Sequence, residues 1–334
     1  MKLGTSLRFL FPTSEQTYPR FKQALAALPP GGFIDRPMGA LSTQAQATNL
    51  LEVAAAAREA DLDMLFFGDH HVVPPDYANS FSPIPTLGRL TAETGTMTLG
   101  AVLLAPFYSP VLLAEQLGTL AAFAGGPLVV TLALGQGKGQ FEAFGMREDS
   151  RVARLEELVA VLRGLLAGEA VTIEGTHHRL AGVTTGPTPA QPVSLWIAGT
   201  VPAAARRAGR IGDGWLTGQN ADHDQLMEQL DVYRESAERH GRSPVPVLRR
   251  DIYVGESDAE AEHVVETILK EGYRGVGMEQ LLVGSAETVA QQLADYRSLG
   301  FDRVLVRHVV GDHQLMLESF RRIGQGVVPR IREL

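Results

Sequence analysis

An acidic residue followed by two histidines, Asp69-His70-His71, is the group in this sequence best suited to chemistry. Histidine exchanges a proton near neutral pH, and a neighbouring carboxylate can fix its tautomer or raise its pKa. Packing of both histidines in a loop is the alternative, and the three residues alone do not decide between the two. Adjacent side chains of an extended chain point in opposite directions. We therefore expect no metal site shared by the two histidines.

Two segments of small residues follow predicted strands. Glycines such as those of Gly135-Gln136-Gly137 let a backbone approach a phosphate or a ring closely. Their spacing fits neither a Walker loop nor the GxGxxG of dinucleotide-binding folds. Gly199-Thr200 precedes a proline suited to the first turn of a helix, where an anion can bind. A flexible turn and simple helix capping by Thr200 are the alternatives.

Other polar and aromatic residues are expected to have structural roles. Arg307-His308 ends the last predicted strand, and we expect it at the surface. Arg249 and Arg250 are expected on a solvated face or in local ion pairs, and Trp215 in the core. The GxSxG nucleophile elbow is absent, which argues against a serine hydrolase.

Short apolar runs typical of strands alternate with helical patterns along the chain. The predicted strands span residues 2–9, 64–67, 97–104, 128–134, 194–198, 214–217, 245–254 and 303–306. The predicted helices span residues 43–60, 110–123, 151–166, 202–210, 224–240, 259–270, 286–299 and 313–323. Thr43 and Gln46 have the spacing of a capping box at the first helix. Repeated strand–helix units imply parallel strands and right-handed connections.

The count of eight strands favours an α/β fold of the (β/α)₈ TIM-barrel type over an open doubly wound sheet, which alternates in the same way. We expect one domain over residues 1–334, with an insertion near residues 171–192 that lies over the barrel. In such a barrel the active site is built from loops at the C-terminal ends of the strands. Asp69-His70-His71 and both glycine-containing segments follow predicted strands, so the fold would bring them to one end.

Composition excludes several classes of function. The 334 residues carry a net charge of −8, which argues against nucleic acid as the main partner. There is no cysteine, which excludes disulfides, thiolate catalysis, zinc-cysteine sites and iron–sulfur clusters. Neither a secretory signal nor an apolar run long enough to span a bilayer is evident. We expect a soluble cytoplasmic protein with no membrane partner.

Several stretches, in this order, resemble the bacterial-luciferase-like flavin-dependent monooxygenase family. The similarity runs over nearly the whole chain, and its clearest stretches are residues 60–71, 99–126, 135–145, 154–157, 195–200, 212–215 and 283–289. The resemblance implies a (β/α)₈ barrel that binds FMN at its C-terminal mouth, or the deazaflavin F420 in a sister branch. It also implies a homodimer.

The resemblance assigns roles residue by residue. His70 matches the first histidine of the family's acid-His-His motif, which is implicated in catalysis, and Asp69 matches its carboxylate. Ala101-Val102 falls where the family has a bulge, with a non-prolyl cis peptide, that supports the flavin ring. The loops that line the flavin phosphate match Gly135, Gln136, Gly137, Gly199 and Thr200.

The resemblance predicts a monooxygenase that uses reduced FMN, supplied by a separate flavin reductase, to oxidise a small organic substrate. His70 would move a proton near the flavin. An F420-dependent dehydrogenase or reductase on the same fold is the first alternative, because deazaflavin members also carry Asp-His after the second strand. A non-catalytic flavin-binding protein is the second. We favour FMN, because residues 101–116 are more similar to the FMN branch.

Two features of the chain depart from the family. Many members carry arginine or histidine where this chain has Pro106-Phe107-Tyr108-Ser109, and Phe107 and Tyr108 belong either to an apolar mouth or to the core. The loop over residues 11–42 has no clear counterpart in the family. We expect it to line a substrate pocket or a dimer contact.

Overall fold

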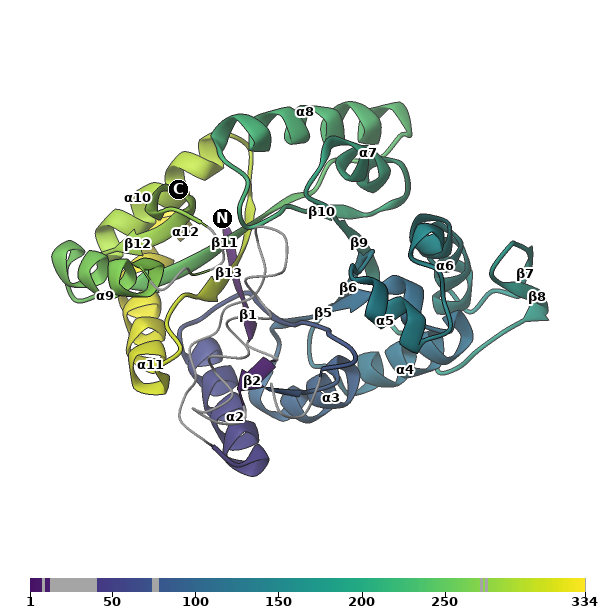
Figure 1. Ribbon diagram of the computed structural model, residues 1–334, viewed down its shortest axis with the longest axis horizontal. Helices are drawn as coiled ribbons and strands as arrows, with labels where there is room; N and C mark the ends of the chain where they lie inside the picture. Colours follow the sequence, from purple (N-terminus) through teal and green to yellow (C-terminus); the bar gives the residue numbers. More distant parts are fainter. Residues whose placement is uncertain (8–9, 13–40, 74–77, 271–272, 274–275, 334) are drawn as a thin grey trace.

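A computed structural model of the protein describes residues 1–7, 10–12, 41–73, 78–270, 273 and 276–333. Eight parallel strands form a closed ring surrounded by helices (Figure 1). They are β1 (Lys2–Leu7), β3 (Met64–Phe67), β5 (Thr98–Leu104), β6 (Leu128–Ala133), β9 (Ser194–Ala198), β10 (Gly214–Leu216), β11 (Pro246–Val254) and β13 (Arg303–His308). Pairing of β10 with β11 closes the ring, and β12 (Leu281–Gly284) extends the sheet from the far end of β11. The predicted (β/α)₈ barrel is confirmed.

Most strands are followed by a helix on the outside of the ring. The long helices are α2 (Thr43–Glu59), α3 (Pro83–Thr94), α4 (Pro110–Phe123), α6 (Arg151–Leu166), α7 (Pro202–Ile211), α8 (His223–Arg239), α9 (Asp258–Lys270), α10 (Ala286–Ser298) and α11 (His313–Arg322). The shorter elements are the turn η1 (Ala105–Phe107), α5 (Lys138–Ala143), the turns η2 (Glu148–Ser150) and η3 (Met278–Gln280), the π-helical η4 (Ile323–Val327) and α12 (Val328–Glu333). In the described ranges no helix is long and apolar enough to cross a membrane.

Three details of these elements differ from the sequence prediction. The sequence did not predict α3, whose first turn contains two prolines, although that turn is where a helix tolerates them. The N-cap of α2 is Ser42, which accepts from the Ala45 N–H, so the capping box at Thr43 and Gln46 is wrong. The insertion after α6 is the hairpin β7 (Val171–Glu174)–β8 (Arg179–Val183), which lies outside the ring and not over it (Figure 1).

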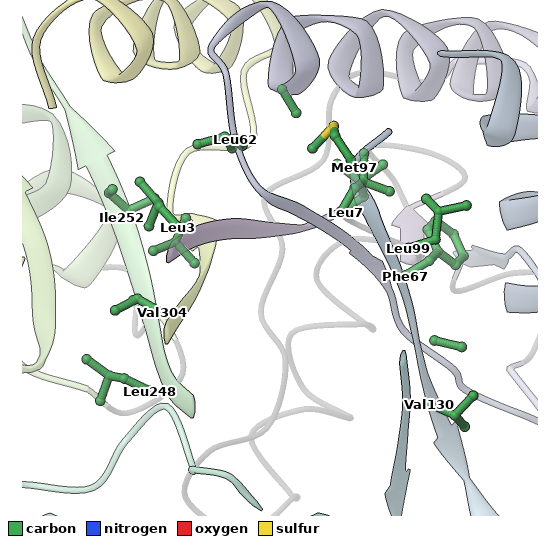
Figure 2. Packing of buried hydrophobic residues seen from close by; sticks show 14 of the residues in the cluster. Leu3, Leu7, Leu62, Phe67, Met97, Leu99, Val130, Leu248, Ile252 and Val304 are labelled. Carbon is green, nitrogen blue, oxygen red and sulfur yellow. The ribbon is translucent and has the colours of Figure 1, made fainter. Parts of the chain in front are cut away.

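Side chains of the barrel strands alternate between the lumen and the helices. Met64, Phe66, Val129, Trp196, Leu216, Val247 and Leu305 form a buried cluster inside the ring. Phe66 and Trp196 stack there at 5.5 Å between ring centroids, and a Cβ on Gly100 would lie 2.3 Å from the Phe66 ring. Residues of the opposite parity, such as Phe67 and Leu99, belong to the outer core (Figure 2). The lumen is therefore packed and not a pore.

Arg249 and Arg250 are buried, so the predicted solvated face is wrong, whereas the alternative of a local ion pair is confirmed for Arg249. Every residue of β11 is buried, because the packed lumen covers one face of the strand and the outer core covers the other. Arg249 lies on the lumen side, 3.2 Å from Asp251. Arg250 faces the helices and donates to the Ala221 carbonyl (2.9 Å) and the Tyr296 hydroxyl (3.0 Å). Both guanidinium groups are thus held by partners inside the fold.

Arg307 and His308 are buried as well, so their predicted surface placement is also wrong. They belong to β13, whose side chains alternate between the packed lumen and the helices outside the ring. Arg307 is in register with Asp251 of β11. The His308 ring lies 3.0 Å from the Ser319 hydroxyl and packs on Phe320 at 4.3 Å. Trp215, in contrast, lies in the core as predicted.

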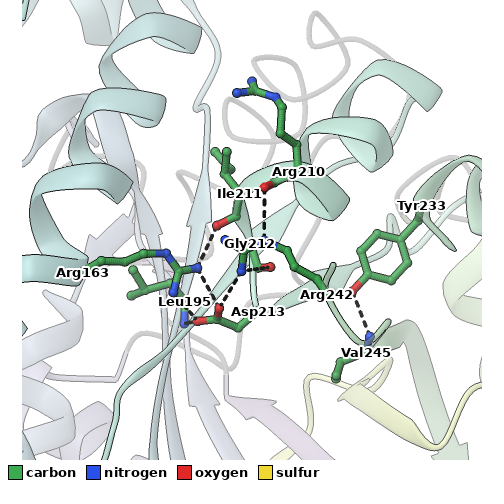
Figure 3. A network of polar contacts seen from close by, with 9 residues as sticks. All are labelled: Arg163, Leu195, Arg210, Ile211, Gly212, Asp213, Tyr233, Arg242 and Val245. Carbon is green, nitrogen blue, oxygen red and sulfur yellow. Dashed lines mark hydrogen bonds and ion pairs between the residues drawn. The ribbon is translucent and has the colours of Figure 1, made fainter. Parts of the chain in front are cut away.

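The Asp213 carboxylate joins four elements at the N-terminal ends of β9 and β10 (Figure 3). It accepts from both terminal nitrogens of Arg163 on α6 (2.7 and 3.2 Å) and from the Leu195 N–H (2.9 Å). Arg242, just after α8, also reaches it (3.3 Å). This end lies opposite the mouth, the end formed by the C-terminal ends of the strands. Its contacts therefore serve stability.

Replacing Asp213 is expected to destabilise the barrel. Asp213→Asn removes the charge that Arg163 and Arg242 share, and we expect the free energy of unfolding to fall by about 2 kcal/mol. Urea denaturation measures this. Glu235→Gln breaks an exposed pair with Arg239 and should change it by less than about 0.5 kcal/mol. Equal stability of the two variants would contradict the assignment.

Candidate active site

Asp69-His70-His71 lies at the mouth of the barrel, directly after β3, as the sequence predicted. All four residues of β3 are buried between β1 and β5. The chain leaves the strand at Gly68, so the acid and the histidines stand where the sheet ends. The predicted loop over residues 11–42 falls mostly on residues 13–40, which lie outside the described residues.

The Asp69 carboxylate connects the ends of β3 and β5. Its side chain is only 1% exposed. The Oδ2 atom accepts from the Leu104 N–H (3.1 Å) and the Tyr108 hydroxyl (2.8 Å). Burial and the charge of Asp69 both raise the pKa of Tyr108, so the phenol stays protonated and donates. The sequence did not identify this role of Tyr108, because it depends on how closely two loops approach.

The same carboxylate faces His71 and not His70. His71 Nε2 lies 3.0 Å from Asp69 Oδ2, at ion-pair distance. The ring is not aligned for a hydrogen bond, and within the described residues this nitrogen has no hydrogen-bond partner. The ring edge meets Phe107 at 5.3 Å and Phe144 at 5.2 Å. Among the described residues, no contact supports a role for Asp69 in setting the tautomer of His70. Asp69 instead positions His71.

His70 is a partly buried imidazole with a fixed backbone. Its carbonyl accepts from the Ser80 hydroxyl (3.1 Å). Burial lowers the pKa of His70 and outweighs the opposing effect of the Asp69 charge, while His71 lowers the pKa further. The ring is therefore neutral at pH 7 and can accept a proton.

Val72, the next residue after the histidines, has a left-handed backbone with φ of 56°. A β-branched side chain is rarely found there, and such a conformation costs about 1–3 kcal/mol. The side chain is also 55% exposed. A strained residue beside a predicted site indicates that the surrounding contacts fix the path of this loop.

The glycine loop after β6 holds a carboxylate where a phosphate was predicted. Gly135 and Gly137 have φ of 67° and 99°, which explains the glycines, and Gln136 between them is exposed. The Gly137 N–H donates to Glu148 (3.3 Å), which also pairs with Arg151 (3.0 Å). An anion bound at Gly137 would have to displace Glu148.

Ala101 and Val102 belong to a regular stretch of β5. Ala101 is in register with Phe67 of β3 and Val102 with Thr131 of β6. The expected cis peptide is wrong, because the bond between them is trans, and Gly186–Pro187 is the one cis peptide in the described part of the chain. Ala101 points into the outer core, whereas Val102 packs against the lumen cluster.

Gly199 and Thr200 lie at the mouth between β9 and α7. A Cβ on Gly199 would lie 2.2 Å from Ala204 Cβ, so only glycine fits. The Gly199 carbonyl accepts from the Trp215 indole (3.2 Å). The N-cap of α7 is Val201, without a side-chain capping bond, so capping by Thr200 is wrong. The exposed Thr200 is left available at a helix N-terminus.

The mouth thus brings together residues from three strand ends. Asp69 and both histidines follow β3, Phe107 and Tyr108 follow β5, and the glycine loop follows β6. No group of three or more histidine, aspartate or glutamate side chains among the described residues could hold a metal ion. The arrangement offers one neutral imidazole, one buried carboxylate and several aromatic rings.

Comparison with known proteins gives the family. The model of the luciferase-like monooxygenase family matches residues 33–303. The chain belongs to this family. The resemblance inferred from the sequence is therefore confirmed, and with it the assignment as a luciferase-like oxidoreductase.

The curated relatives carry one activity in their names. The F420-dependent glucose-6-phosphate dehydrogenase of Beutenbergia cavernae is 34% identical over 190 residues. That match covers 54% of this chain and 56% of the relative, little more than half of each. The enzyme of the same name from Intrasporangium calvum is 26% identical over 322 residues, covering 85% and 95%.

Solved structures share the fold at lower identity. The monooxygenase RslO1 of Streptomyces bottropensis has a TM-score of 0.79 at 24% identity, covering 98% of this chain and 99% of that one. An F420-dependent secondary alcohol dehydrogenase, solved with an F420-acetone adduct, has a TM-score of 0.71 at 19% identity, covering 86% and 96%. One barrel therefore supports both oxygenases and deazaflavin enzymes.

The lowered pKa of His70 predicts how stability depends on pH. The unfolded chain has a histidine pKa of about 6.5 and binds the proton more readily than the folded one. The free energy of unfolding should therefore fall as the pH drops below about 6.5. In His70→Gln this fall should be smaller, whereas His223→Gln, at the exposed start of α8, should keep it. Denaturation from pH 5 to 8 measures this, and an unchanged profile in His70→Gln would contradict it.

Proposed function

We propose that the protein is an F420-dependent oxidoreductase that exchanges a hydride with a small alcohol or carbonyl compound. The observation that carries the proposal is the position of His70 at the mouth of the barrel, directly after β3, where burial lowers its pKa. Oxidising an alcohol releases one proton for each hydride, so the site needs a base that is unprotonated at neutral pH. The curated relatives described above, which are F420-dependent dehydrogenases, support this cofactor over FMN.

The proposed reaction balances with one protein group. The hydroxyl proton of the alcohol passes to the His70 imidazole, the carbon–hydrogen bond breaks, and a carbonyl forms. When bound, F420 would accept the hydride, and with it both electrons. In the reverse direction the His70 imidazolium returns the proton. Asp69 acts at a distance from this step, since it holds His71 and the end of β5 in place.

The cofactor fits one of the predicted loops better than the other. Thr200 offers an exposed hydroxyl beside the uncapped start of α7, which suits a phosphate group, and Gly199 lets the chain pack closely on Ala204 of that helix. Val102, which packs against the lumen cluster, would help to hold the ring system. Gly137 fits a phosphate poorly, because Glu148 already accepts from its N–H.

A monooxygenase that uses reduced FMN from a separate reductase is the second candidate. It is favoured by the likeness to RslO1, which extends over 98% of this chain. His70 would move a proton in this reaction as well, so the structure of the site alone does not distinguish the two. Binding without any turnover would instead indicate a non-catalytic flavin-binding protein.

Cofactor titration separates the two candidates. We expect F420 to bind at least about tenfold more tightly than FMN, a difference of about 1.4 kcal/mol. Anaerobic fluorescence titration of the purified protein measures both affinities. Tighter binding of FMN, together with oxygen consumption in the presence of reduced FMN, would replace the proposal by the second candidate.

Removing the imidazole of His70 tests its role. His70→Ala should lower kcat by about 10²- to 10⁴-fold while cofactor binding is kept, because only the proton acceptor is lost. His178→Ala is the matched control: burial lowers the pKa of this histidine too, but it follows β7, outside the ring of helices (Figure 1). Its kcat should not change. A fully active His70→Ala enzyme would remove the assignment.

A further inference from the structure

We infer that the mouth carries an aromatic subsite for the apolar part of the substrate. The substrate class is then an aromatic or alicyclic alcohol or carbonyl compound and not a sugar phosphate. The subsite, called the aromatic wall below, consists of His71, Phe107, Phe141 and Phe144. This inference rests on the proposed function and narrows it.

Phe107 is the centre of the aromatic wall. Phe144 stacks on it with ring centroids 4.6 Å apart, and Phe141 lies at 4.8 Å. The edge of His71 meets both Phe107 (5.3 Å) and Phe144 (5.2 Å). Phe141 is fully buried and anchors the group, whereas Phe144 is 39% exposed. The rings therefore form a fixed surface with one open side, the geometry in which further apolar or aromatic groups stack.

The glycine loop is built to accommodate this wall. A Cβ on Gly135 would lie 3.4 Å from the Phe107 ring, and its φ of 67° suits glycine. The four rings come from three strand ends, since His71 follows β3, Phe107 follows β5, and the other two follow β6. They belong to the same mouth as His70. A substrate bound on the wall would thus lie in the part of the molecule that holds the proposed base.

Exposed apolar side chains concentrate at this end of the barrel. The large hydrophobic residues exposed in the described part of the chain are Val72, Leu112, Phe123, Phe144 and Val201. Val72, Phe144 and Val201 follow β3, β6 and β9, and Val72 keeps its exposure despite a strained backbone. Of these residues, Phe144 belongs to the aromatic wall and gives it an exposed ring.

The charges around the glycine loop disfavour a phosphate. All three cations of residues 135–151 form ion pairs with carboxylates. The pairs are Lys138–Glu142, Arg147–Asp149 and Arg151–Glu148. Asp69 adds a buried negative charge behind the wall. A dianionic sugar phosphate placed here would meet carboxylates, whereas an uncharged ring would meet the aromatic faces.

Substrate preference tests the inference. With F420, benzyl alcohol or cyclohexanol should give a kcat/KM at least about tenfold above that of glucose 6-phosphate. Phe144→Ala should raise KM for benzyl alcohol about tenfold with little change in kcat, and Phe144→Tyr should restore it. Phe123→Ala removes an even more exposed ring from the end of α4 (72% against 39% for Phe144) and should change neither constant. A preference for glucose 6-phosphate would overturn the inference.

A binding measurement without turnover separates this inference from the proposed function. Saturation-transfer NMR of benzyl alcohol with the purified protein should show contact in wild type and Phe123→Ala and a weaker signal in Phe144→Ala. If that pattern is seen while neither F420 nor FMN supports turnover, the proposed function fails and the subsite stands. If Phe144→Ala behaves like Phe123→Ala, the subsite is wrong whichever cofactor is used.

Discussion

The buried charge of Asp69 fixes the geometry of the mouth. A carboxylate removed from water is stable only when hydrogen bonds and charges surround it. Asp69 accepts hydrogen bonds from the Leu104 N–H and the Tyr108 hydroxyl, and the His71 ring lies 3.0 Å away. These contacts tie the end of β3 to the end of β5. This link between the two strand ends positions the aromatic neighbours of His71 and the backbone of His70.

In the closed barrel, the contacts that stabilise the fold and the residues of the candidate site lie in different places. The lumen beneath the mouth is filled by apolar side chains such as Phe66 and Trp196, so the candidate site has a rigid floor. The ion pairs of Asp213 hold the opposite end, where no predicted site residue lies. Changes in the mouth loops can therefore alter binding without loosening the barrel, as the range of activities on this fold requires.

The sequence predicted all eight barrel strands and the place of Asp69-His70-His71, because short apolar runs and the ends of strands are local features. It did not predict contacts between distant segments. Arg250 is buried because groups outside the ring, such as Tyr296 of α10, cover that face of β11. Asp69 accepts from Tyr108 because the turn after β5 lies beside the end of β3. Glu148, which lies eleven residues further along the chain, accepts a hydrogen bond from the Gly137 N–H. Such pairings are set by the closed fold and by no single motif.

The pairing of β1 with β13 has a consequence for folding. Lys2 is in register with Arg303, so one edge of β1 has no partner until nearly the whole chain has been made. Contacts this distant in sequence are slow to form, and an unpaired strand edge invites association with other chains. During synthesis β1 can pair with β3 alone, and half of its hydrogen-bonding groups wait for β13. Pairing of β13 with the free edge of β1 therefore closes this part of the barrel sheet.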